Sequence, residues 1–575
     1  MFCDINQFDR VFMVDTEFQQ LDGERPSVHC VVTKDADDMK EYRYWTGSGH
    51  EMPDYLSSPR NLIVCYSASA EWQAFEAIGW DVKCEVLDLW VVFRCLTNGL
   101  PEIRSTSQIA ALNIFGMKGC SQGRKENMRA LAMRGAPFTE QEKADLLEYC
   151  AQDVEDLAHL FVLLRPFLDL GRDLLRSRYV LATAEMESVG IPIDVEYYEA
   201  LVGNLEIVKK RLIERLDEAG IYDDGSFRLK RFEALINELG TPWPRTHTGQ
   251  FQVDRRSFRD YGSSCEILRK LGTLRNLLSK LQRFKLPIGK DGRCRTNLRP
   301  FASKTGRNQP SSTKFVFGLP RWMRGLVKAP DGKCLVYIDF SQQELAVAAA
   351  LSGDNALQDA YISGDPYLEF GKAARLIPRD ATKESHGRER EIYKQVVLGV
   401  QYGMGARTLA EKTSLPIIEA RNLLKEHRRA YPDFWRWSDG APVYGHYYST
   451  IHTAFGWRLN VSPDTKPTSL QNFPCQANGA EILRIACLLL RENHFKVLCT
   501  VHDAVLLEID DTVVTEKTFE AQSLMEEASR LVLGGFSVST DYEIVRPGER
   551  FLPDSGEARD IWNIVDSILT ETQHV

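Results

Sequence analysis

The sequence lacks the features that mark a membrane, secreted or disulfide-linked protein. No apolar run reaches the ~18 residues that a membrane-spanning helix needs. The opening residues, Met-Phe-Cys-Asp-Ile-Asn, have neither the basic start nor the apolar segment of a signal peptide. The 13 cysteines are odd in number and form no Cys-x-x-Cys pair, which argues against a disulfide framework or a zinc site. These absences predict a protein of the reducing cytoplasm with no membrane partner.

Internal repeats and low-complexity tracts are absent as well, and the chain is too long for one hydrophobic core. Its 575 residues predict three or four units of about 150 residues each. Strands are expected at residues 11–14 and 62–65, and helices at 144–164 and 174–188. Helices then dominate from 354 to 437, before strands and helices mix again. The pattern predicts an α/β unit followed by an α+β unit.

The net charge of −9 hides an uneven distribution of charge. The stretch from Arg269 to Lys333 carries 17 Lys and Arg side chains and two acids, so the rest of the chain is strongly acidic. Such a concentrated basic stretch is typical of a protein that binds a polyanion along its length. A solvated surface run is the alternative, but the interleaved Leu, Phe, Trp and Pro residues favour a folded segment.

Two short strings deliver an aspartate at the end of a β-branched or apolar run. The first, Val-Tyr-Ile-Asp-Phe-Ser-Gln-Gln-Glu, contains Asp339, and the second, Val-His-Asp-Ala-Val, contains Asp503. The apolar residues before each aspartate offer it no solvation, so another group must. A pair of Mg²⁺ ions shared by the two carboxylates would clamp the attacking and leaving oxygens of a phosphoryl transfer. The alternative is that both are ordinary turn aspartates.

A helical pattern near residue 390 carries polar and apolar side chains along one face. At four-residue steps along it lie Arg390, Lys394, Leu398 and Tyr402. The two cations near the helix N-terminus suit the phosphates of a nucleotide, and the next two side chains suit its sugar and base. The alternative is an amphipathic helix with a solvated basic edge.

A second set of acids lies in the first part of the chain. Asp15 and Glu17 are two apart on a predicted strand and so share one face. Tyr149 and Asp153 are one turn apart on a predicted helix, and Glu71 lies between these segments in the sequence. Acids from three segments, together with a tyrosine, suggest a hydrolytic two-metal site with a water oriented by Tyr149. Surface acids of an α/β domain are the alternative.

Together these strings resemble the motifs of family A DNA polymerases, the bacterial DNA polymerase I family. The matching order and spacing extend to Thr305-Gly-Arg307, Asn472-Phe-Pro-Cys-Gln476 and the closing segment from Ile544 to Trp562. The acids of the first part resemble the DEDD 3′→5′ proofreading exonuclease that precedes the polymerase in this family. Glu71 stands where that pattern has an aspartate, and Asp88 and Asp156 are secondary candidates.

The resemblance implies an α/β RNase H-like exonuclease domain followed by an α+β right-hand polymerase. The exonuclease domain is expected in residues 1–170 and the polymerase domain in residues 171–575. The expected divisions of the polymerase are a thumb at about 195–290, a palm at about 291–370 and 438–575, and fingers at about 371–437. Since no 5′ nuclease precedes the exonuclease, a short replicative enzyme of phage or plasmid type is expected.

At the polymerase site, the resemblance makes Asp339 and Asp503 the ligands of two Mg²⁺ ions. Lys394 would protonate the pyrophosphate, and Glu344 would exclude a 2′-hydroxyl group. The implied nucleotide-binding residues are Arg390, Lys394, Glu344, Gln342, Tyr367, Leu398 and Tyr402. The implied DNA-binding residues are Arg307, Asn472, Gln476, His502, Lys280 and Arg283, with Lys270, Arg275 and Lys285 also placed along the duplex.

At the exonuclease site, Asp15, Glu17 and Asp153 would hold two further Mg²⁺ ions, with Glu71 and Tyr149 as catalytic partners. Mn²⁺ is expected to substitute at either site. The expected partners are primer–template DNA and dNTPs, with a single-strand binding protein and a helicase or primase beyond them. The enzyme is expected to be a monomer in the cytoplasm.

Four residues depart from the family pattern. Leu398 replaces an aromatic residue, Ala346 an arginine, Tyr367 a histidine and Ala504 a glutamate. Since none of these changes removes a metal ligand, activity with an altered nucleotide preference is expected, and a preference for 2-aminoadenine is one case. Two other functions stay open. RNA synthesis on the same scaffold is one, against which Glu344 counts, and a catalytically silent DNA-binding relative is the other, against which the intact acids count.

Overall fold

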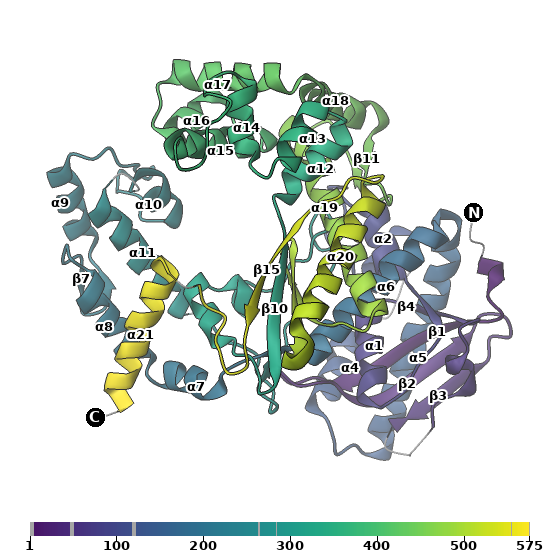
Figure 1. The fold of residues 1–575 in the computed structure, drawn as a ribbon. Coiled ribbons are helices and arrows are strands. Elements are labelled where there is room, and N and C mark those ends of the chain that lie inside the picture. Colours follow the sequence, from purple (N-terminus) through teal and green to yellow (C-terminus); the bar gives the residue numbers. More distant parts are fainter. Residues whose placement is uncertain are drawn as a thin grey trace.

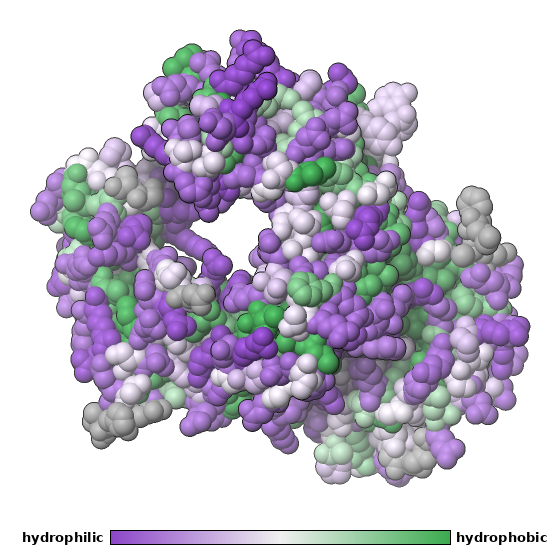
Figure 2. Space-filling view, viewed as in Figure 1, coloured by the Kyte–Doolittle hydropathy of each residue, from purple (hydrophilic) through white to green (hydrophobic). Residues whose placement is uncertain are grey.

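The computed structural model describes residues 5–46, 51–117, 122–262, 265–282, 284–553 and 555–573. Figure 1 shows four groups of elements: a mixed sheet with its helices at the lower right, a central antiparallel sheet, a helical group above it and another to its left. Figure 2 shows an opening between the two helical groups and the central sheet, bordered largely by hydrophilic residues. None of the described helices is long and apolar enough to cross a membrane.

The first group is a five-stranded mixed sheet of order β3-β2-β1-β4-β5. Its strands are β1 (Val11–Gln19), β2 (Ser27–Asp35), β3 (Glu41–Trp45), β4 (Leu62–Cys65) and β5 (Glu85–Asp88). Strand β1 pairs antiparallel with β2 and parallel with β4. The helices of this group are α1 (Ala68–Ala77), α2 (Leu89–Thr97), α3 (Gln108–Ile114), α4 (Gln122–Arg134) and α5 (Glu140–Leu164). This arrangement confirms the predicted α/β unit.

Two helices of this region differ in extent from the predictions. Helix α5 begins at Glu140, before the predicted residue 144, because Thr139 and Glu142 form a capping box there. Helix α6 (Leu170–Val189) begins before the predicted residue 174 and packs against α1 and β5 on one side. On the other side it packs against α19 (Pro467–Glu492) and β13 (Lys496–Val501) of the central group. The expected domain boundary at residue 170 therefore falls in the first turn of a helix that both groups share.

The central sheet has four antiparallel strands in the order β13-β14-β10-β15. Besides β13 it contains β10 (Lys333–Phe340), β14 (Ala504–Asp510) and β15 (Thr540–Val545), and helix α20 (Val514–Val532) packs against it. On β10, Val336 and Ile338 are buried, whereas Tyr337 and Asp339 are partly exposed on the opposite face. One face of the sheet thus packs into the core and the other carries the polar side chains.

The two helical groups flank the open face of the central sheet (Figure 1). The group at the left of the view contains α7 (Val195–Gly203), α8 (Leu205–Leu216), α9 (Leu229–Leu239), α10 (Arg255–Tyr261) and α11 (Glu266–Leu281), and α21 (Glu557–Gln573) packs against α8. The upper group contains α12 (Gln343–Ser352), α13 (Asn355–Ile362), α14 (Pro366–Ala373), α15 (Gly387–Gln401), α16 (Ala406–Thr413), α17 (Ile417–Ala430) and α18 (Pro432–Tyr448). These helices confirm the predicted helical region at 354–437.

Part of the basic stretch is neutralised within the protein. Arg293 pairs with Glu508 at 2.5 Å, and Lys270 pairs with Glu218 at 2.7 Å. Arg295 is buried, with 8% of its surface exposed. The charge of this stretch therefore serves the fold as well as the surface, which composition alone did not predict.

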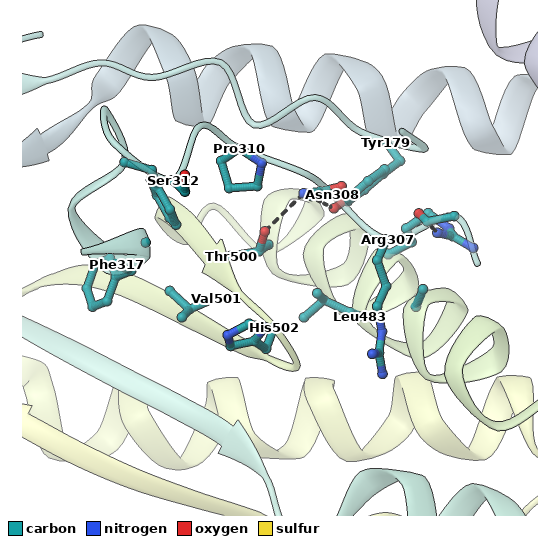
Figure 3. Close-up of a pocket in the computed structure, with 15 residues that line it drawn as sticks. Tyr179, Arg307, Asn308, Pro310, Ser312, Phe317, Leu483, Thr500, Val501 and His502 are labelled. Atoms are coloured by element: carbon teal, nitrogen blue, oxygen red, sulfur yellow. Dashed lines mark hydrogen bonds between the residues drawn. The ribbon is translucent and has the colours of Figure 1, made fainter. Parts of the chain in front are cut away.

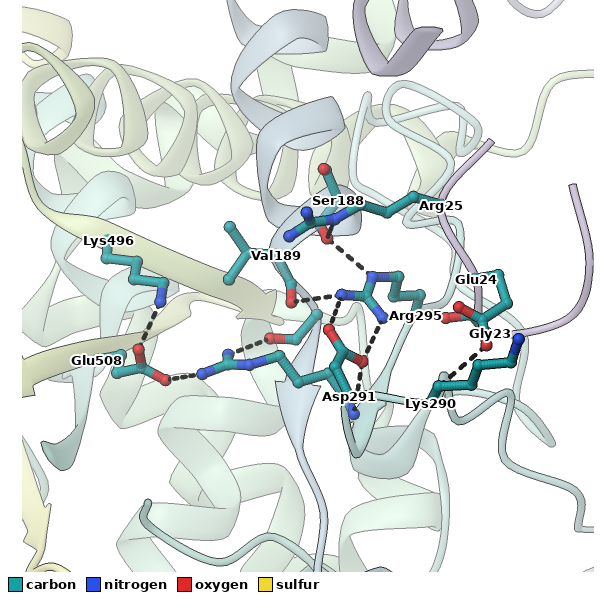
Figure 4. Close-up of polar contacts among 12 residues, drawn as sticks. Gly23, Glu24, Arg25, Ser188, Val189, Lys290, Asp291, Arg295, Lys496 and Glu508 are labelled. Atoms are coloured by element: carbon teal, nitrogen blue, oxygen red, sulfur yellow. Dashed lines mark hydrogen bonds and ion pairs between the residues drawn. The ribbon is translucent and has the colours of Figure 1, made fainter. Parts of the chain in front are cut away.

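Arg295 joins three segments that are distant in the sequence (Figure 4). Its Nε donates to the carbonyl of Ser188 at 2.8 Å, at the end of α6, and its Nη1 donates to the carbonyl of Gly23 at 3.0 Å. Both terminal nitrogens also bind the carboxylate of Asp291, at 2.8 and 2.5 Å. The guanidinium holds the pKa of Asp291 down to about 2. One buried cation thus connects the mixed sheet, the shared helix and the hairpin that follows the left-hand helical group.

Replacing Arg295 by Ala is expected to lower the free energy of unfolding by about 3 kcal/mol, because buried carbonyl groups lose a charged donor. A lower urea midpoint, followed by tryptophan fluorescence, would report the loss. Lys290→Ala is the matched control, since it removes an exposed cation from the same hairpin. It keeps the hydrogen bond that the backbone N–H of residue 290 donates to the carboxylate of Glu24. Equal midpoints for the two variants would contradict the role given to Arg295.

Candidate active sites

The first site lies at the edge of the central sheet, where a tight hairpin presents Asp503. Val501 at the end of β13 pairs with Ala504 at the start of β14, so His502 and Asp503 alone form the turn. His502 has a φ of +59°, in the left-handed region that two-residue hairpins require. The predicted turn location of Asp503 follows from this geometry.

Strand β10 brings Asp339 to the same edge. Asp339 pairs with Ala504 on β14, the residue that directly follows Asp503. The two carboxyl groups come close enough to share a hydrogen bond, although Asp339 and Asp503 are far apart in the sequence. On its other side, Asp339 pairs with Asp541 of β15.

Burial and mutual repulsion make this pair hard to ionise. Burial raises the pKa of Asp339 to about 7, with the charge of Asp503 as the next cause. Burial also raises the pKa of Asp503. The Oδ1 atom of Asp339 is buried and has no hydrogen-bond partner among the described residues. An unpartnered carboxylate oxygen beside a second carboxylate is what a divalent cation would satisfy, so these residues fit Mg²⁺.

Helix α15 carries the predicted row of polar and apolar side chains. Arg390, Lys394 and Leu398 are all partly exposed on it. The guanidinium of Arg390 lies 5.2 Å from the ring centre of Tyr367, and the ammonium of Lys394 lies 6.0 Å from it. Asp365, which the motifs did not indicate, binds Arg390 at 2.5 Å. The two cations therefore stand over one aromatic ring, with an acid fixing the first of them.

Glu344 is held at two points beside the aspartate pair. It lies in the first turn of α12, which begins directly after Gln342 in a left-handed conformation with a φ of +52°. Arg307 Nη2 binds Glu344 Oε1 at 3.0 Å, and the hydroxyl of Tyr402 hydrogen-bonds the same carboxylate. Tyr402 follows the last residue of α15, and Asp503 is near enough for its charge to act on Tyr402. The end of α15 is thus tied to the edge of the central sheet.

A groove of about 210 Å³ runs beside the hairpin, with Arg307 and His502 in its lining (Figure 3). Asn308 spans it and donates to the hydroxyl of Tyr179 at 2.9 Å and to that of Thr500 at 3.0 Å. Of the other predicted DNA contacts, Asn472 and Gln476 lie one turn apart on α19 and are partly exposed. Lys280 is partly exposed on α11, Lys285 is exposed after it, and Arg283 lies outside the described residues.

The second site lies on the mixed sheet, where β1 and α5 meet. Asp15, Glu17 and Asp153 each offer a carboxylate oxygen, and these three atoms lie within 4.8 Å of one another. Three oxygen donors at this spacing fit a divalent cation. The hydroxyl of Tyr149 hydrogen-bonds Asp153, which lies one turn further along α5.

Glu71 lies close to this group on α1. It is only 3% exposed, and its Oε2 has no hydrogen-bond partner among the described residues. Burial raises its pKa, followed by the charge of Asp15. Asp88, in contrast, caps α2 through Trp90 N and also accepts from the backbone of Ala68. Glu71 therefore fits the missing position better than Asp88, whose oxygens already serve the backbone.

Burial raises the pKa of each acid in the second site. The pKa of Asp15 rises to about 8, with the charge of Asp153 as the next cause.

Two residues near these acids were not predicted, because no motif in the sequence pointed to them. Lys125 on α4 lies 3.7 Å from Asp153, and the thiol of Cys150 lies 3.4 Å from Asp15 Oδ2. Only the packing of α4 and α5 on β1 brings these two residues to the acids.

Several known proteins resemble this chain in sequence. Residues 232–545 match the family model for DNA polymerase family A. The chain is 25% identical over 448 residues to DNA polymerase I of Aquifex aeolicus, covering 71% of this chain and 76% of that one. It is 26% identical over 550 residues to the DNA polymerase of Mycobacterium phage D29, covering 86% and 84%. It spans 45% of the longer DNA polymerase I of Helicobacter pylori, at 26% identity.

A solved structure shows the same fold. The POL domain of Pol1 from M. smegmatis, in complex with DNA primer-template and dNTP, matches with a TM-score of 0.68 at 18% identity, covering 94% of this chain and 95% of that one. The protein belongs to DNA polymerase family A. Its fold is that of a right-hand polymerase, and we use the names palm for the central sheet, fingers for the upper helical group and thumb for the left-hand one. The predicted fold class is confirmed.

Replacing Asp339 by Asn is expected to stabilise the metal-free protein. The pKa of Asp339 in the folded state, about 7, lies above its ordinary value of 3.8, so the folded state loses stability as the pH rises between these values. In EDTA, the apparent Tm of the variant should exceed that of the wild type by a margin that grows from pH 5 to pH 8 and reaches about 2 °C. Differential scanning calorimetry measures this margin, and Mg²⁺ should narrow it by stabilising the wild type.

Asp510→Asn is the control for that measurement, because it changes an exposed acid at the other end of β14. Its Tm margin should not grow with pH. A margin that grows equally in both variants would show that the raised pKa of Asp339 is not its cause.

Proposed function

We propose that this polymerase extends a DNA primer on a DNA template with dNTPs, at the site formed by Asp339 and Asp503. The observation that carries the proposal is the meeting of these two carboxylates at one edge of the palm, with a buried and unpartnered oxygen on Asp339. Mg²⁺ bound there, or Mn²⁺ in its place, supplies Lewis-acid stabilisation of the attacking and leaving oxygens. The two carboxylates hold the cations and must be ionised to do so.

Two positively charged side chains of α15 bind the triphosphate of the incoming nucleotide. Arg390 and Lys394 are partly exposed on the same helix face, and charge-assisted hydrogen bonds to phosphate oxygens suit both. The ring of Tyr367 beneath them, and the pairing of Arg390 with Asp365, limit where these side chains can move. Lys394 is the group that donates a proton to the departing pyrophosphate.

Glu344 selects the sugar. Its carboxylate is fixed from two sides, by Arg307 and by Tyr402. A rigid acid beside the aspartate pair leaves no room for a 2′-hydroxyl group, which supports the use of dNTPs over NTPs. The sugar edge of the nucleotide then lies between the first turn of α12 and the end of α15.

The duplex product lies over the hairpin and the mouth of the groove beside it. Arg307 and His502 line that groove, and Asn472 and Gln476 present polar groups from α19. Minor-groove acceptors are nearly alike for all base pairs, so these side chains check pairing geometry without reading sequence. The exposed Lys285 and the partly exposed Lys280 bind phosphates of the duplex. DNA binding should therefore weaken as the salt concentration rises.

Primer extension with Mg²⁺ tests the polymerase assignment. Asp503→Asn should lower the rate at least about a thousandfold, because it removes a ligand of the catalytic cations. The control Asp510→Asn changes an exposed acid on the same strand and should extend normally. Parallel reactions with NTPs should fail for the wild type and improve for Glu344→Ala. Normal extension by Asp503→Asn would overturn the assignment, and wild-type extension with NTPs would favour the RNA-synthesising alternative.

We also propose that the site on β1 and α5 removes nucleotides from the primer 3′ end by hydrolysis. The observation that supports it is the group of Asp15, Glu17 and Asp153, whose ligand atoms lie within 4.8 Å of one another. Glu71 adds a fourth carboxylate from α1, and its unpartnered oxygen fits a cation ligand. The hydroxyl of Tyr149, held by Asp153, orients the attacking water.

Degradation of a 3′-mismatched primer tests this second activity. The double variant Asp15→Ala, Glu17→Ala should lose degradation by at least about a hundredfold while primer extension persists. The control pair Asp37→Ala, Asp38→Ala removes the same charge from an exposed turn and should degrade the primer normally. Unchanged degradation by the Asp15→Ala, Glu17→Ala variant would contradict the exonuclease assignment.

The combination of the two proposed sites in one chain suits a replicative enzyme of phage type. The match to the DNA polymerase of Mycobacterium phage D29, which spans 86% of this chain and 84% of the relative, supports this reading. A proofreading site on the same chain allows a mismatched primer end to be removed without a separate enzyme.

A further inference from the structure

The pairing of β10 with both of its neighbours brings a third carboxylate to the polymerase site. Asp339 lies opposite Ala504 on β14 and opposite Asp541 on β15. Residues directly opposite each other on antiparallel strands project from the same face, with Cβ atoms about 4.5–5.5 Å apart. Asp541 therefore flanks Asp339 on the side away from Asp503.

The electrostatic interactions agree with this shared face. The negative charge of Asp541 contributes to the raised pKa of Asp339, after burial and the other aspartate of the pair. Two residues further along β15, Glu543 lies opposite Tyr337, and both counter the effect of burial on the pKa of Arg324. The polar face of β15 is thus the face that carries the polymerase site.

The start of β15 is fixed firmly to the end of β10. Ser341 N donates to the carbonyl of Ser539 at 2.9 Å, and the hydroxyl of Tyr361 donates to the carbonyl of Ser341 at 3.0 Å. Ser341 Oγ donates to Asp541 Oδ2 at 2.5 Å. Asp541 is exposed, so its carboxylate keeps its hydration while this hydrogen bond orients it.

We propose that Asp541 is a third carboxylate of the polymerase site and helps to hold the divalent cations there. The inference rests on Asp339 and Asp503 as the metal pair of the proposed function. Carboxylate oxygens are preferred ligands of Mg²⁺ and Mn²⁺, and β15 supplies one where β14 supplies only the methyl group of Ala504. Because Ser341 holds its carboxylate, Asp541 contributes through a bound water, and its loss weakens cation binding.

Mn²⁺ binding to the full chain without nucleotide, followed by electron paramagnetic resonance, tests the proposal. The background carries Asp15→Ala and Glu17→Ala, so that the exonuclease acids do not contribute. In this background, Asp541→Asn should weaken binding about tenfold, as expected for a carboxylate that supports the ligands of a metal. Asp541→Glu keeps the carboxylate and should stay within about twofold of the background.

Two control variants separate the carboxylate from its surroundings. Ser341→Ala removes the hydrogen bond to Asp541 and keeps the charge, whereas Glu543→Gln removes an equal charge two residues along the same strand face. Glu543→Gln should bind Mn²⁺ as the background does, whereas Ser341→Ala, which releases the carboxylate without removing it, should weaken binding by less than Asp541→Asn does. The proposal is overturned if Ser341→Ala weakens binding as much as Asp541→Asn, or if Asp541→Asn binds as tightly as the background.

Asp503→Asn distinguishes this proposal from the proposed function. It should abolish Mn²⁺ binding in the same background, and retained binding would overturn the metal pair itself. Lost binding in Asp503→Asn with normal binding in Asp541→Asn would overturn only the role of Asp541. The Mg²⁺ concentration for half-maximal primer extension should rise about tenfold in Asp541→Asn, with extension restored at saturating Mg²⁺, which a misfolded variant would not show.

Discussion

In both sites the fold holds carboxyl groups close together and partly buried, although burial and mutual repulsion both disfavour their ionised forms. Burial is the largest cause of the raised pKa of Asp339 and Asp503 in the palm, and of Asp15 and Asp153 on the mixed sheet. Free side chains of this kind would separate into water. A divalent cation bound at either site would relieve both the repulsion and the poor solvation, so the same strain that costs stability would favour metal binding.

The scaffold resists this strain by fixing the backbone at each acid. Asp339 is held by strand pairing on both sides, and Asp503 by a two-residue turn. On the mixed sheet, the acids lie on β1 and on α5, whose start is fixed by its capping box. Helix α6 and the buried Arg295 then connect the two halves, and one hydrophobic core is continuous between them. The site at Asp339 and Asp503 and the group of acids on β1 and α5 are therefore carried by one packed body.

What could be predicted from the sequence is what depends on neighbouring residues. The apolar runs predicted that Asp339 and Asp503 lie at strand ends or turns, and the four-residue steps predicted the shared face of α15. The fold class implied by these motifs is confirmed. Pairing across the sheet has no such local signal, so Asp541 was not found. Lys125 was missed for the same reason, because only packing brings α4 to β1. Arg295 counted toward a polyanion-binding stretch, yet its partners are backbone carbonyl groups and the carboxylate of Asp291.

The difference between the two neighbours of Asp339 explains where an additional charge can stand. Ala504 has no exposed surface, so an acid in its place would have to be desolvated beside two acids whose pKa values are already raised. Asp541 lies on β15, an edge strand of the sheet, and is exposed. An exposed carboxylate keeps most of its hydration and can still act on a cation nearby, whereas a buried one costs several kcal/mol before any metal binds. The edge strand is therefore the side of Asp339 on which the palm can strengthen its metal site without losing the stability of its core.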